Sequence, residues 1–361
     1  MMNKVNDNKC DKSSEKTGKK KELKQKAIKI LLILSIAYFI FLLFVLLIEY
    51  VVGETHWVFI LIIYSPQALY VILPLIFICV SCFFRSKVNL LINVFSFLIV
   101  IFFLMGLNIH INPDNSKDGK VNNQLKVLTY NIHSGTYGAK KVAAFLKKSE
   151  ADLIFLQEAH QTAKKTRPDP IPDILNTFPG WYHIRGGERK ELMIISRYPL
   201  VDFEERKLGT FRKCLMGYMI WKNKKIRVIN VHFNIAHPGK SLIRSGTNFR
   251  EYLYYSSIVR IKQAEALREI IKDEKNPILL VGDFNAIPNT KTHRIINRKL
   301  TDCFEKAGNG IGYTYNSRLP MWRIDFIFVS DDFRALNCNK LPVRISDHFP
   351  LEALLELAGK K

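Results

Sequence analysis

The stretch Asn276 to Pro288 reads NPILLVGDFNAIP. Within it, Ile278 to Val281 is a short, continuous apolar run bounded by a proline and a glycine, as in a strand buried on both faces. Asp283 and Asn285 follow two residues apart, so in an extended chain both polar side chains leave on the same side. The pair is either an Asx turn that closes a strand or part of a site. Partners elsewhere in the chain decide between these readings.

The N-terminal part of the chain is apolar after a short polar start. Residues 1–26 are polar and rich in lysine, which predicts a basic cytoplasmic tail. Residues 27–52, 58–84 and 88–107 are apolar runs, each reaching the roughly 20 residues that a helix needs to cross a bilayer. The first run is too long for the apolar core of a signal peptide. The sequence therefore predicts three transmembrane helices.

Basic residues set the expected orientation of these spans. Lysines precede the first span, and Arg85 and Lys87 lie between the second and third, whereas the loop after the first span carries Glu54 and His56. By the positive-inside rule the N-terminus is cytoplasmic, and three crossings place the chain after the third span outside the cytoplasm. The sequence thus predicts a multi-pass protein of the cell membrane. If one span is re-entrant, this orientation is reversed.

The net charge is +22 over 361 residues. A basic chain favours anionic partners such as nucleic acid, phosphorylated lipid headgroups or an anionic bilayer, although plain solubility explains it too. Residues 108–124 are rich in Asn, Asp, Lys and Gly, which predicts a flexible linker that keeps the following domain near the membrane.

Residues 125–357 alternate between strand-like runs and amphipathic helices without internal repeats. This pattern predicts an α/β domain in which two packed, mainly antiparallel sheets are flanked by helices. The expected strands are 125–130, 153–156, 191–196, 215–221, 226–232, 278–281, 324–329 and 351–357, and the expected helices are 139–148, 252–272 and 290–297.

Polar residues recur where these strands begin or end. Each alone is most simply a capping or turn residue, but a buried carboxylate is costly unless it is paired or bound to metal. Acids, amides and imidazoles at so many strand ends therefore predict one shared site. They are Asn131, Glu158, His232, Asp283, Asn285, Asp325, Asp347 and His348.

Six ordered motifs within residues 125–357 resemble the endonuclease/exonuclease/phosphatase superfamily, which includes deoxyribonucleases, exonuclease III-like repair enzymes and neutral sphingomyelinases. The resemblance implies a four-layer α/β sandwich and metal-dependent cleavage of a phosphoester, and it says much less about the substrate. The motifs are TYNIHSG (129–135), DLIFLQE (152–158), VINVHFN (228–234), LLVGDFNAIP (279–288), WRIDFIFVS (322–330) and ISDHFPLEALLEL (345–357).

The resemblance implies a Mg²⁺ site, with Mn²⁺ as an alternative ion. Glu158 is the first expected ligand, with Asn131 beside it and Asp347 as a second carboxylate. Mg²⁺ prefers oxygen ligands and keeps several waters, so one or two carboxylates and the substrate phosphate are sufficient.

The expected catalytic roles follow from the same resemblance. Asp283 is the expected base for the attacking water, and Asn285 is expected to donate a hydrogen bond to a phosphate oxygen. His348 is expected to donate to the phosphate as an imidazolium, oriented by Asp325, which should raise its pKa.

Further residues complete the predicted substrate site. His232 corresponds to the second phosphate-contacting histidine of the superfamily, and Arg212 is either a phosphate contact or a solvated loop charge. His133 departs from the residues usual at its position, so no metal role is assigned to it. The segment 237–255 is rich in basic and aromatic residues and is expected to determine substrate specificity.

Three functional readings remain open on the sequence. The first is a membrane-anchored, Mg²⁺-dependent phosphodiesterase or phosphatase that acts outside the cytoplasm on lipid headgroups or another anionic phosphoester. The second is a surface nuclease that degrades DNA or RNA. The third, a catalytically inactive binding module, is disfavoured by the complete set of acidic and histidine residues. The expected partners are the bilayer and the substrate, and no protein partner is predicted.

Overall fold

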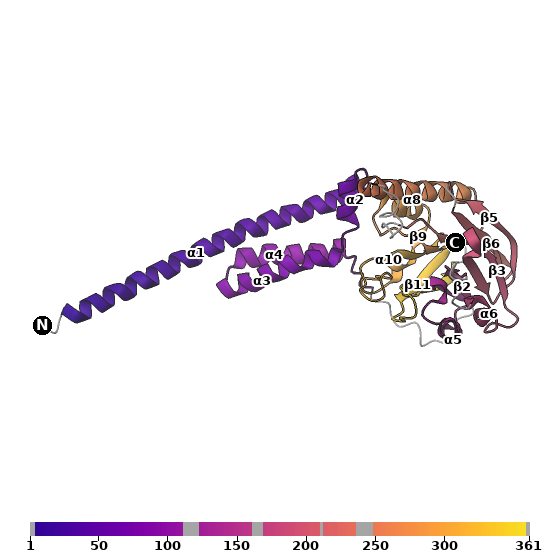
Figure 1. Cartoon of the computed structure of the whole chain (residues 1–361), viewed down its shortest axis with the longest axis horizontal. Coiled ribbons are helices and arrows are strands. Elements are labelled where there is room, and N and C mark those ends of the chain that lie inside the picture. Colours follow the sequence, from indigo (N-terminus) through magenta and orange to yellow (C-terminus); the bar gives the residue numbers. More distant parts are fainter. Residues whose placement is uncertain (1–3, 111–122, 161–168, 210–211, 236–247, 359–361) are drawn as a thin grey trace. The chain divides into compact units, whose positions relative to one another are not determined.

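The computed structural model describes residues 4–110, 123–160, 169–209, 212–235 and 248–358 (Figure 1). The chain divides into two compact units. The helical unit consists of Met1–Ile48 and Pro66–Gly106, and the sandwich unit consists of Glu49–Ser65 and Leu107–Lys361. The sandwich unit thus includes a segment from between two apolar helices.

Three helices are long and apolar enough to cross a membrane: Thr17–Val52, Gln67–Phe84 and Lys87–Leu104. They overlap the three predicted runs, but the first starts ten residues earlier than predicted, the second starts nine residues later and the third ends three residues earlier. Their elements are α1 (Lys4–Leu47), η1 (Ile48–Val52), η2 (Gln67–Val71), α3 (Ile72–Phe84), α4 (Lys87–Ile99) and η3 (Val100–Leu104).

Small polar side chains join the helices of the helical unit. Asn93 Nδ2 donates to Ser35 Oγ at 2.9 Å, and Asn89 Nδ2 donates to the carbonyl oxygen of Ile28 at 3.1 Å. Hydrogen bonds of this kind hold helices together in lipid, where burial of apolar surface gives no driving force between them.

The predicted second span, residues 58–84, is wrong in its first part. The chain forms a separate short helix, α2 (Trp57–Ile63), then breaks before Pro66 and starts the apolar helix at Gln67. Proline disfavours helical geometry in the residue before it, which explains the break. The apolar side of α2 is buried within the sandwich unit, where Ile60 and Ile63 are each 1% exposed.

The sandwich unit contains two sheets, as predicted, and each has six strands. In each sheet one pair is parallel, β1 with β2 and β7 with β8, and the other pairs are antiparallel. The first sheet has the order β11-β12-β1-β2-β4-β3 and the second β5-β6-β7-β8-β10-β9. The strands are β1 (Gln124–Asn131), β2 (Leu153–Gln157), β3 (Tyr182–Gly186), β4 (Leu192–Ser196), β5 (Leu200–Lys207), β6 (Lys213–Trp221), β7 (Lys224–His232), β8 (Ile278–Asp283), β9 (Thr301–Asp302), β10 (Asp325–Val329), β11 (Phe333–Lys340) and β12 (Leu351–Leu357).

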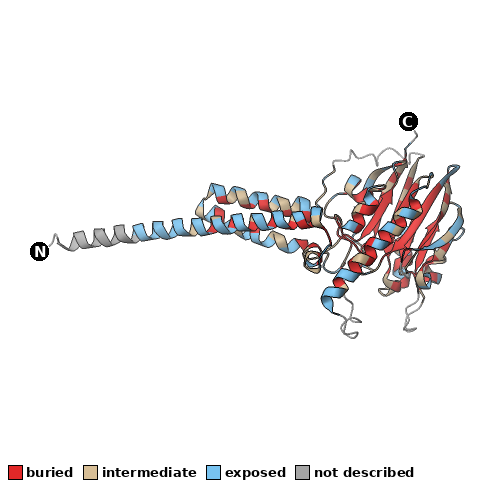
Figure 2. Ribbon diagram, turned by 90° about the horizontal axis from the view of Figure 1, so that it is seen from above, coloured by how far each residue is buried: buried red, intermediate tan, exposed pale blue. Residues whose placement is uncertain are grey.

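Helices cover the outer faces of both sheets and complete four layers (Figures 1 and 2). One hydrophobic core lies between the sheets, a second joins α8 and α9 to the second sheet, and a third joins α5 and α6 to the first. Besides α2, the described helices of this unit are α5 (Ala139–Ser149), α6 (Pro170–Leu175), α8 (Phe249–Ile271), α9 (Lys291–Asn297) and α10 (Cys303–Ala307), with short 3-10 turns η5 (His133–Gly135) and η6 (Glu188–Lys190).

A buried amide pair joins the two sheets below the predicted site. Gln157 Nε2 donates to Asn230 Oδ1 at 2.8 Å, and Asn230 Nδ2 donates to the carbonyl oxygens of Leu156 and Met193, both at 2.9 Å. Because unpaired amides are costly in a core, these bonds fix the register of one sheet on the other.

Every predicted strand and helix of the domain is present with small shifts at its ends, but four strands were not predicted. They are β3, β5, β9 and β11. β5 reads LVDFEERK and is mostly exposed at the edge of its sheet, and β11 reads FRALNCNK with a bulge between Ala335 and Asn337. Such strands lack the apolar run that marks a buried strand.

The predicted linker 108–124 is bound to the sandwich unit at its start. Asn108 N donates to the carbonyl oxygen of Gly310 at 3.0 Å, and His110 N donates to Asn309 Oδ1 at 2.8 Å. These first residues are therefore not a free coil. Residues 111–122 lie outside the part that the structure describes.

Candidate active site

The predicted residues meet where the parallel strands of the two sheets end. β1 and β2 run in register to Asn131 and Gln157, so Glu158 follows directly beside Asn131. In the other sheet, His232 of β7 is paired with Asp283 of β8, and Asp283 is paired with Asp325 of β10. Because these strands are neighbours in their sheets, the motifs at their ends lie side by side and form one site although they are far apart in sequence.

Asn131 links the two sheets at this point. Its Nδ2 lies 3.1 Å from Glu158 Oε1 and 3.1 Å from Asp283 Oδ2. Its Oδ1 accepts a hydrogen bond from His133 N at 3.1 Å. The buried amide therefore fixes both carboxylates relative to each other.

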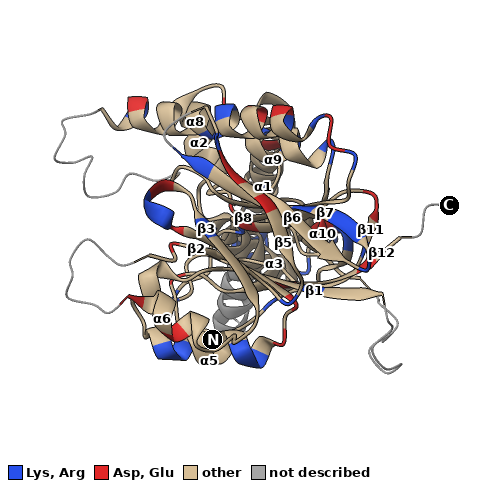
Figure 3. Cartoon of the chain, turned by 90° about the vertical axis from the view of Figure 1, so that its right-hand side faces the viewer, with Lys and Arg blue, Asp and Glu red and all other residues tan. Residues whose placement is uncertain are grey.

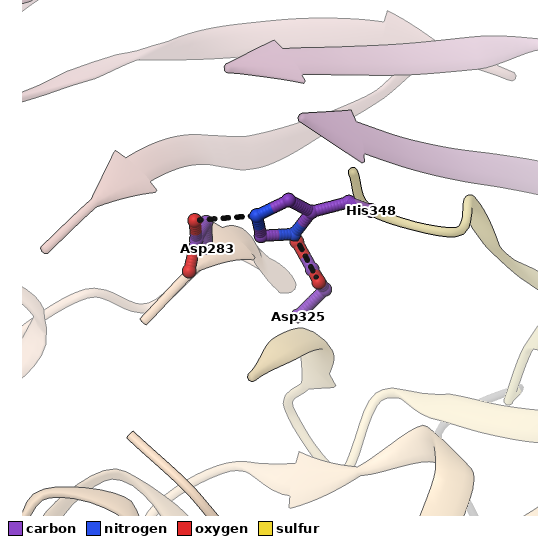
Figure 4. A group of neighbouring side chains, drawn as sticks. All are labelled: Asp283, Asp325 and His348. Atoms are coloured by element: carbon purple, nitrogen blue, oxygen red, sulfur yellow. Dashed lines mark hydrogen bonds and ion pairs between the residues drawn. The ribbon is translucent and has the colours of Figure 1, made fainter. Parts of the chain in front are cut away.

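His348 lies between two aspartates (Figure 4). Its Nδ1 is 2.9 Å from Asp325 Oδ2, and its Nε2 is 3.8 Å from Asp283 Oδ2. All three side chains are buried. The predicted orientation of His348 by Asp325 matches this geometry, and Nε2 is the ring atom turned toward Asp283.

The charges of this trio shift its pKa values. Burial and the neighbouring Asp325 carboxylate raise the pKa of Asp283 to about 6. Burial alone would lower the pKa of His348, but the charge and hydrogen bond of Asp325 raise it to about 10. At neutral pH His348 is therefore a cation and Asp283 is close to the pKa best suited to a general base.

A second part of the site is more open. His133 Nδ1 lies 3.6 Å from Glu158 Oε2 and 3.3 Å from Asp347 Oδ2, and these carboxylates are 26% and 24% exposed. Burial alone would raise the pKa of Glu158, but His232, a hydrogen bond from Asn131 and the His133 charge lower it. His133, to which the sequence assigned no metal role, thus lies between two expected metal ligands.

The donor chemistry of this part fits a divalent cation. Two partly exposed carboxylates and an amide converge at the strand ends, and hard cations prefer such oxygens. A second grouping that could hold an ion is Asp283, Asp325 and His348. The Nδ2 atom of Asn131 faces both Glu158 and Asp283. The side-chain amide must therefore rotate by about 180° before its oxygen can bind a metal ion there.

Glu191 is a site residue that sequence reasoning missed. His232 Nδ1 is 3.2 Å from Glu191 Oε2, and Arg212 Nη1 donates to Glu191 Oε1. Burial alone would raise the pKa of Glu191, but His232 and Arg212 lower it to about 2. In turn, Glu191 outweighs the effect of burial and raises the pKa of His232. Glu191 directly precedes the apolar run of β4. An acidic residue at the end of a buried strand is the sequence signal that could have identified it as a site residue.

A cleft of about 310 Å³ opens beside the acidic residues. It adjoins Glu158 and His232. Arg212 also lines it and is 14% exposed beside Glu191, so this arginine is not a solvated loop charge, and its contact with phosphate stays a prediction. Its lining residues are Glu158, His160, Glu188, Arg189, Glu191, Arg212, His232 and Ile235.

The remaining predictions have mixed outcomes. Asn285 is 7% exposed, and its Nδ2 donates to the carbonyl oxygen of Phe233 at 3.0 Å, so one of its two N–H groups is used within the fold. Tyr315, which was not predicted, contacts the ring of His348 with centroids 4.8 Å apart. Of the predicted substrate-choosing segment 237–255, the part up to residue 247 lies outside the described residues.

Comparisons with known proteins agree with the fold and identify the family. The sequence pattern of the endonuclease/exonuclease/phosphatase family matches residues 128–348. A family protein from Bacteroides thetaiotaomicron has 19% identity and a TM-score of 0.52, covering 65% of this chain and 98% of its own. A second, from Bacteroides vulgatus, has 20% identity and a TM-score of 0.51, covering 65% and 99%.

A conserved protein of unknown function from Enterococcus faecalis also has this fold, with 20% identity and a TM-score of 0.50, covering 65% of this chain and 100% of its own. The comparison with curated proteins gave no match. At such identities these structures establish the fold, and the family match over most of the sandwich unit establishes the family. The chain therefore belongs to the endonuclease/exonuclease/phosphatase family, whose members are metal-dependent phosphoric ester hydrolases.

Proposed function

We propose that this chain is a membrane-anchored, Mg²⁺-dependent phosphoester hydrolase that acts outside the cytoplasm on phosphate groups of lipids. The observation that carries the catalytic part is the pairing of buried Asp283 with His348 at 3.8 Å, where Asp325 raises the pKa of His348 to about 10. A base and a cationic donor at that spacing can act on one phosphate and its attacking water.

Asp283 acts as the base in this proposal. It accepts the proton of a water whose oxygen attacks phosphorus, and the bond from phosphorus to the leaving oxygen breaks. Its position is fixed by Asn131 Nδ2 at 3.1 Å and by the backbone N–H of Asn285 at 2.9 Å. A carboxylate with a pKa of about 6 is largely ionised at neutral pH and still accepts a proton readily.

Two histidines bind the phosphate in this proposal. The Nε2 atoms of His348 and His232 lie 3.8 Å and 3.7 Å from the same oxygen, Asp283 Oδ2. Each ring is paired through Nδ1 with its own carboxylate, Asp325 and Glu191 respectively, and each carboxylate raises the pKa of its histidine and so favours the protonated ring. Each ring can therefore donate through Nε2 to an anionic oxygen whose charge grows in the transition state.

Glu158 and Asp347, with Asn131 after its amide turns over, would hold the divalent cation. When bound, Mg²⁺ supplies Lewis-acid polarisation of a phosphoryl oxygen and offsets negative charge. The partial exposure of both carboxylates leaves room for water ligands, which Mg²⁺ keeps.

The fold of the sandwich unit supports the extracytoplasmic orientation. Glu49–Ser65 and Leu107 onward belong to this one unit, and parts of one folded unit must lie on the same side of a membrane. The chain between them must therefore cross an even number of times, which the helices Gln67–Phe84 and Lys87–Leu104 satisfy by crossing once each. With the lysine-rich N-terminus in the cytoplasm, the sandwich unit lies outside it.

A surface nuclease is the second candidate, supported by the net charge of +22. On the side drawn in Figure 3, however, Lys and Arg alternate with Asp and Glu along α8 and around α5 and α6. A mixed surface of this kind contributes to solubility and does not by itself favour a nucleic-acid backbone.

The test uses the full chain in lipid nanodiscs with Mg²⁺. Release of headgroup phosphate from phosphatidylinositol phosphate or phosphocholine from sphingomyelin is measured beside nicking of supercoiled plasmid. Asp283→Ala and His348→Ala should abolish the activity, and Asp331→Ala, at an exposed carboxylate after β10, should leave it unchanged. Lipid hydrolysis that is lost in both active-site variants supports the proposal. Plasmid nicking lost in both variants, without lipid hydrolysis, would replace it with the nuclease.

A further inference from the structure

The segment Glu49–Ser65, here called the strap, joins two candidate membrane spans and folds as part of the sandwich unit. Its buried carboxylate anchors it. Glu54 Oε1 accepts a hydrogen bond from Ser257 Oγ at 2.9 Å, and Glu54 Oε2 accepts one from Lys291 N at 2.8 Å. Glu54 is 3% exposed. A carboxylate buried in this way costs several kcal/mol if its partners are lost, so the strap is an integral part of the fold.

The C-terminal end of the strap is fixed by two further residues of the sandwich unit. Arg260 Nη2 donates to Tyr64 Oη at 3.1 Å, and its guanidinium lies 5.1 Å from the centre of the Tyr64 ring. Trp322 Nε1 donates to the carbonyl oxygen of Tyr64 at 3.1 Å. The next candidate span begins at Gln67, so these bonds lie within three residues of it.

The other points where spans meet the sandwich unit are fixed as well. Arg294 Nη1 donates to the carbonyl oxygens of Glu49 and Tyr50, both at 3.0 Å, at the end of the first span. After the third span, Asn108 Nδ2 donates to the carbonyl oxygen of Phe304 at 3.1 Å. If the domain were joined to the spans by flexible linkers, the residues next to the spans would not be hydrogen-bonded to the sandwich unit at each of these points.

We propose that these contacts hold the sandwich unit directly on the outer surface of the bilayer, and that the surface around the strap and the N-terminal half of α8 contacts the lipid. The strap cannot leave the membrane surface, because both of its ends continue into candidate spans. The parts of the sandwich unit that are hydrogen-bonded to the strap are therefore held at the membrane surface as well. The inference rests on the proposed function only for the identity of the substrate.

Exposed aromatic residues on α8 agree with a lipid-facing surface. Phe249, Tyr254 and Tyr255 are 46%, 45% and 68% exposed. Arg250 lies over the ring of Trp57 in the strap, 4.7 Å from its centre. Aromatic and basic side chains are favoured at the membrane interface, where one end contacts acyl chains and the other contacts headgroups.

The strap is also connected to the catalytic residues through two stacked rings. Trp322, which binds Tyr64, stacks on Tyr315 with centroids 6.1 Å apart, and Tyr315 contacts His348. The active site therefore lies close to the membrane-facing strap. Its substrates are phosphoesters carried by molecules embedded in the same bilayer, because these are concentrated at the membrane surface beside the site. Soluble esters are not concentrated there.

The docking is tested by quenching of tryptophan fluorescence with brominated lipids in nanodiscs that contain the full chain and no substrate. Trp322→Phe removes a tryptophan that should lie at the lipid surface, so the quenched fraction of the total fluorescence should fall. Trp181→Phe is the matched control, because Trp181 directly precedes β3 and packs on Phe178 and Arg197, which belong neither to the strap nor to α8. Its removal should raise the quenched fraction. A rise of the same size in both variants would overturn the docking.

A second measurement breaks the strap itself. Glu54→Ala should slow hydrolysis of bilayer lipid several-fold and leave hydrolysis of a small soluble phosphoester unchanged. Glu269→Ala, at an exposed glutamate in the C-terminal half of α8, should change neither rate. Equal losses on both substrates would overturn the role of the strap in substrate access. A wild-type chain inactive on every ester would count against the proposed function, while the quenching result would still decide the docking.

Discussion

Two clusters of the sandwich unit, each made of one histidine and two acidic residues, have opposite electrostatics. The catalytic cluster is Asp283, Asp325 and His348, and the ion-pair cluster is His293, Asp302 and Glu305; in each, the ligand atoms lie within 4.8 Å of one another. The ion-pair cluster also contains Arg323, which donates to Asp302 at 2.6 Å and to Glu305 at 3.4 Å. Among the described residues, Asp325 Oδ1 has no hydrogen-bond partner.

The arginine accounts for the difference in pKa. Burial would raise the pKa of Asp302, but Arg323 and His293 lower it to about 2. The pKa of Asp283 is instead raised to about 6, by burial and by Asp325. A cluster whose charges are balanced internally stabilises the fold, whereas one with surplus negative charge can bind a cation or accept a proton. Residue types alone do not separate these roles.

The largest expected effect comes from removing the catalytic charge. Asp283→Asn should lower the rate of phosphoester hydrolysis by about 10²–10⁴-fold, because the base is lost. It should not lower the thermal midpoint, since a carboxylate whose pKa is raised by folding is destabilising in its ionised form. Initial rates and circular dichroism melting in detergent check both parts. A lower midpoint together with an unchanged rate would assign Asp283 to the scaffold.

The matched change in the ion-pair cluster should have the opposite result. Asp302→Asn leaves Arg323 buried without its closest carboxylate, and loss of one partner of a buried pair costs about 3–5 kcal/mol. Asparagine can still cap α10, so the cap is retained. The thermal midpoint should fall while the rate per folded molecule is unchanged. A rate loss as large as that of Asp283→Asn would end the distinction between the clusters.

Metal binding separates the open part of the site from the ion-pair cluster. Glu158→Gln should weaken Mg²⁺ binding at least as much as the roughly 10–100-fold typical of residues that support metal ligands. Glu305→Gln should leave the affinity unchanged, because Arg323 already occupies that cluster. The Mg²⁺ dependence of the melting temperature reports both affinities. Weaker binding in Glu305→Gln would place a metal in the ion-pair cluster.

The smallest expected effect is a pH dependence of stability. The pKa of Asp302 is depressed by folding from 3.8 to about 2, so its contribution is complete above the unfolded value and is lost as pH falls toward 2. The stability difference between the wild type and Asp302→Asn should therefore shrink by about 2 kcal/mol between pH 5 and pH 2. Denaturant unfolding at several pH values measures it, and a constant difference would contradict the assigned charge state.

Much of the fold and of the site could be predicted from the sequence. Apolar runs such as Ile278 to Val281 mark buried strands, and the polar residues that follow them mark the strand ends that form the site. Asn131, Glu158, Asp283, Asp325 and His348 are brought together as expected.

The residues that escaped prediction depend on distant contacts. Glu191 and His232 are 41 residues apart and come from different sheets, so no local pattern joins them. The run WVFILII in α2 is as apolar as a membrane span, and its packing on α8 is not visible in the sequence. His133 follows Asn131 closely, but its position between two carboxylates depends on a residue more than 200 positions away, Asp347.

The central claim is that the cluster at Asp283 performs hydrolysis whereas the cluster at Asp302 stabilises the fold. The most direct test measures the initial rate of lipid phosphoester hydrolysis by the full chain in nanodiscs with Mg²⁺, normalised to folded protein, for the wild type, Asp283→Asn and Asp302→Asn. We predict a rate that falls by about 10²–10⁴-fold in Asp283→Asn only. Rates that are equal in the two variants would contradict the claim.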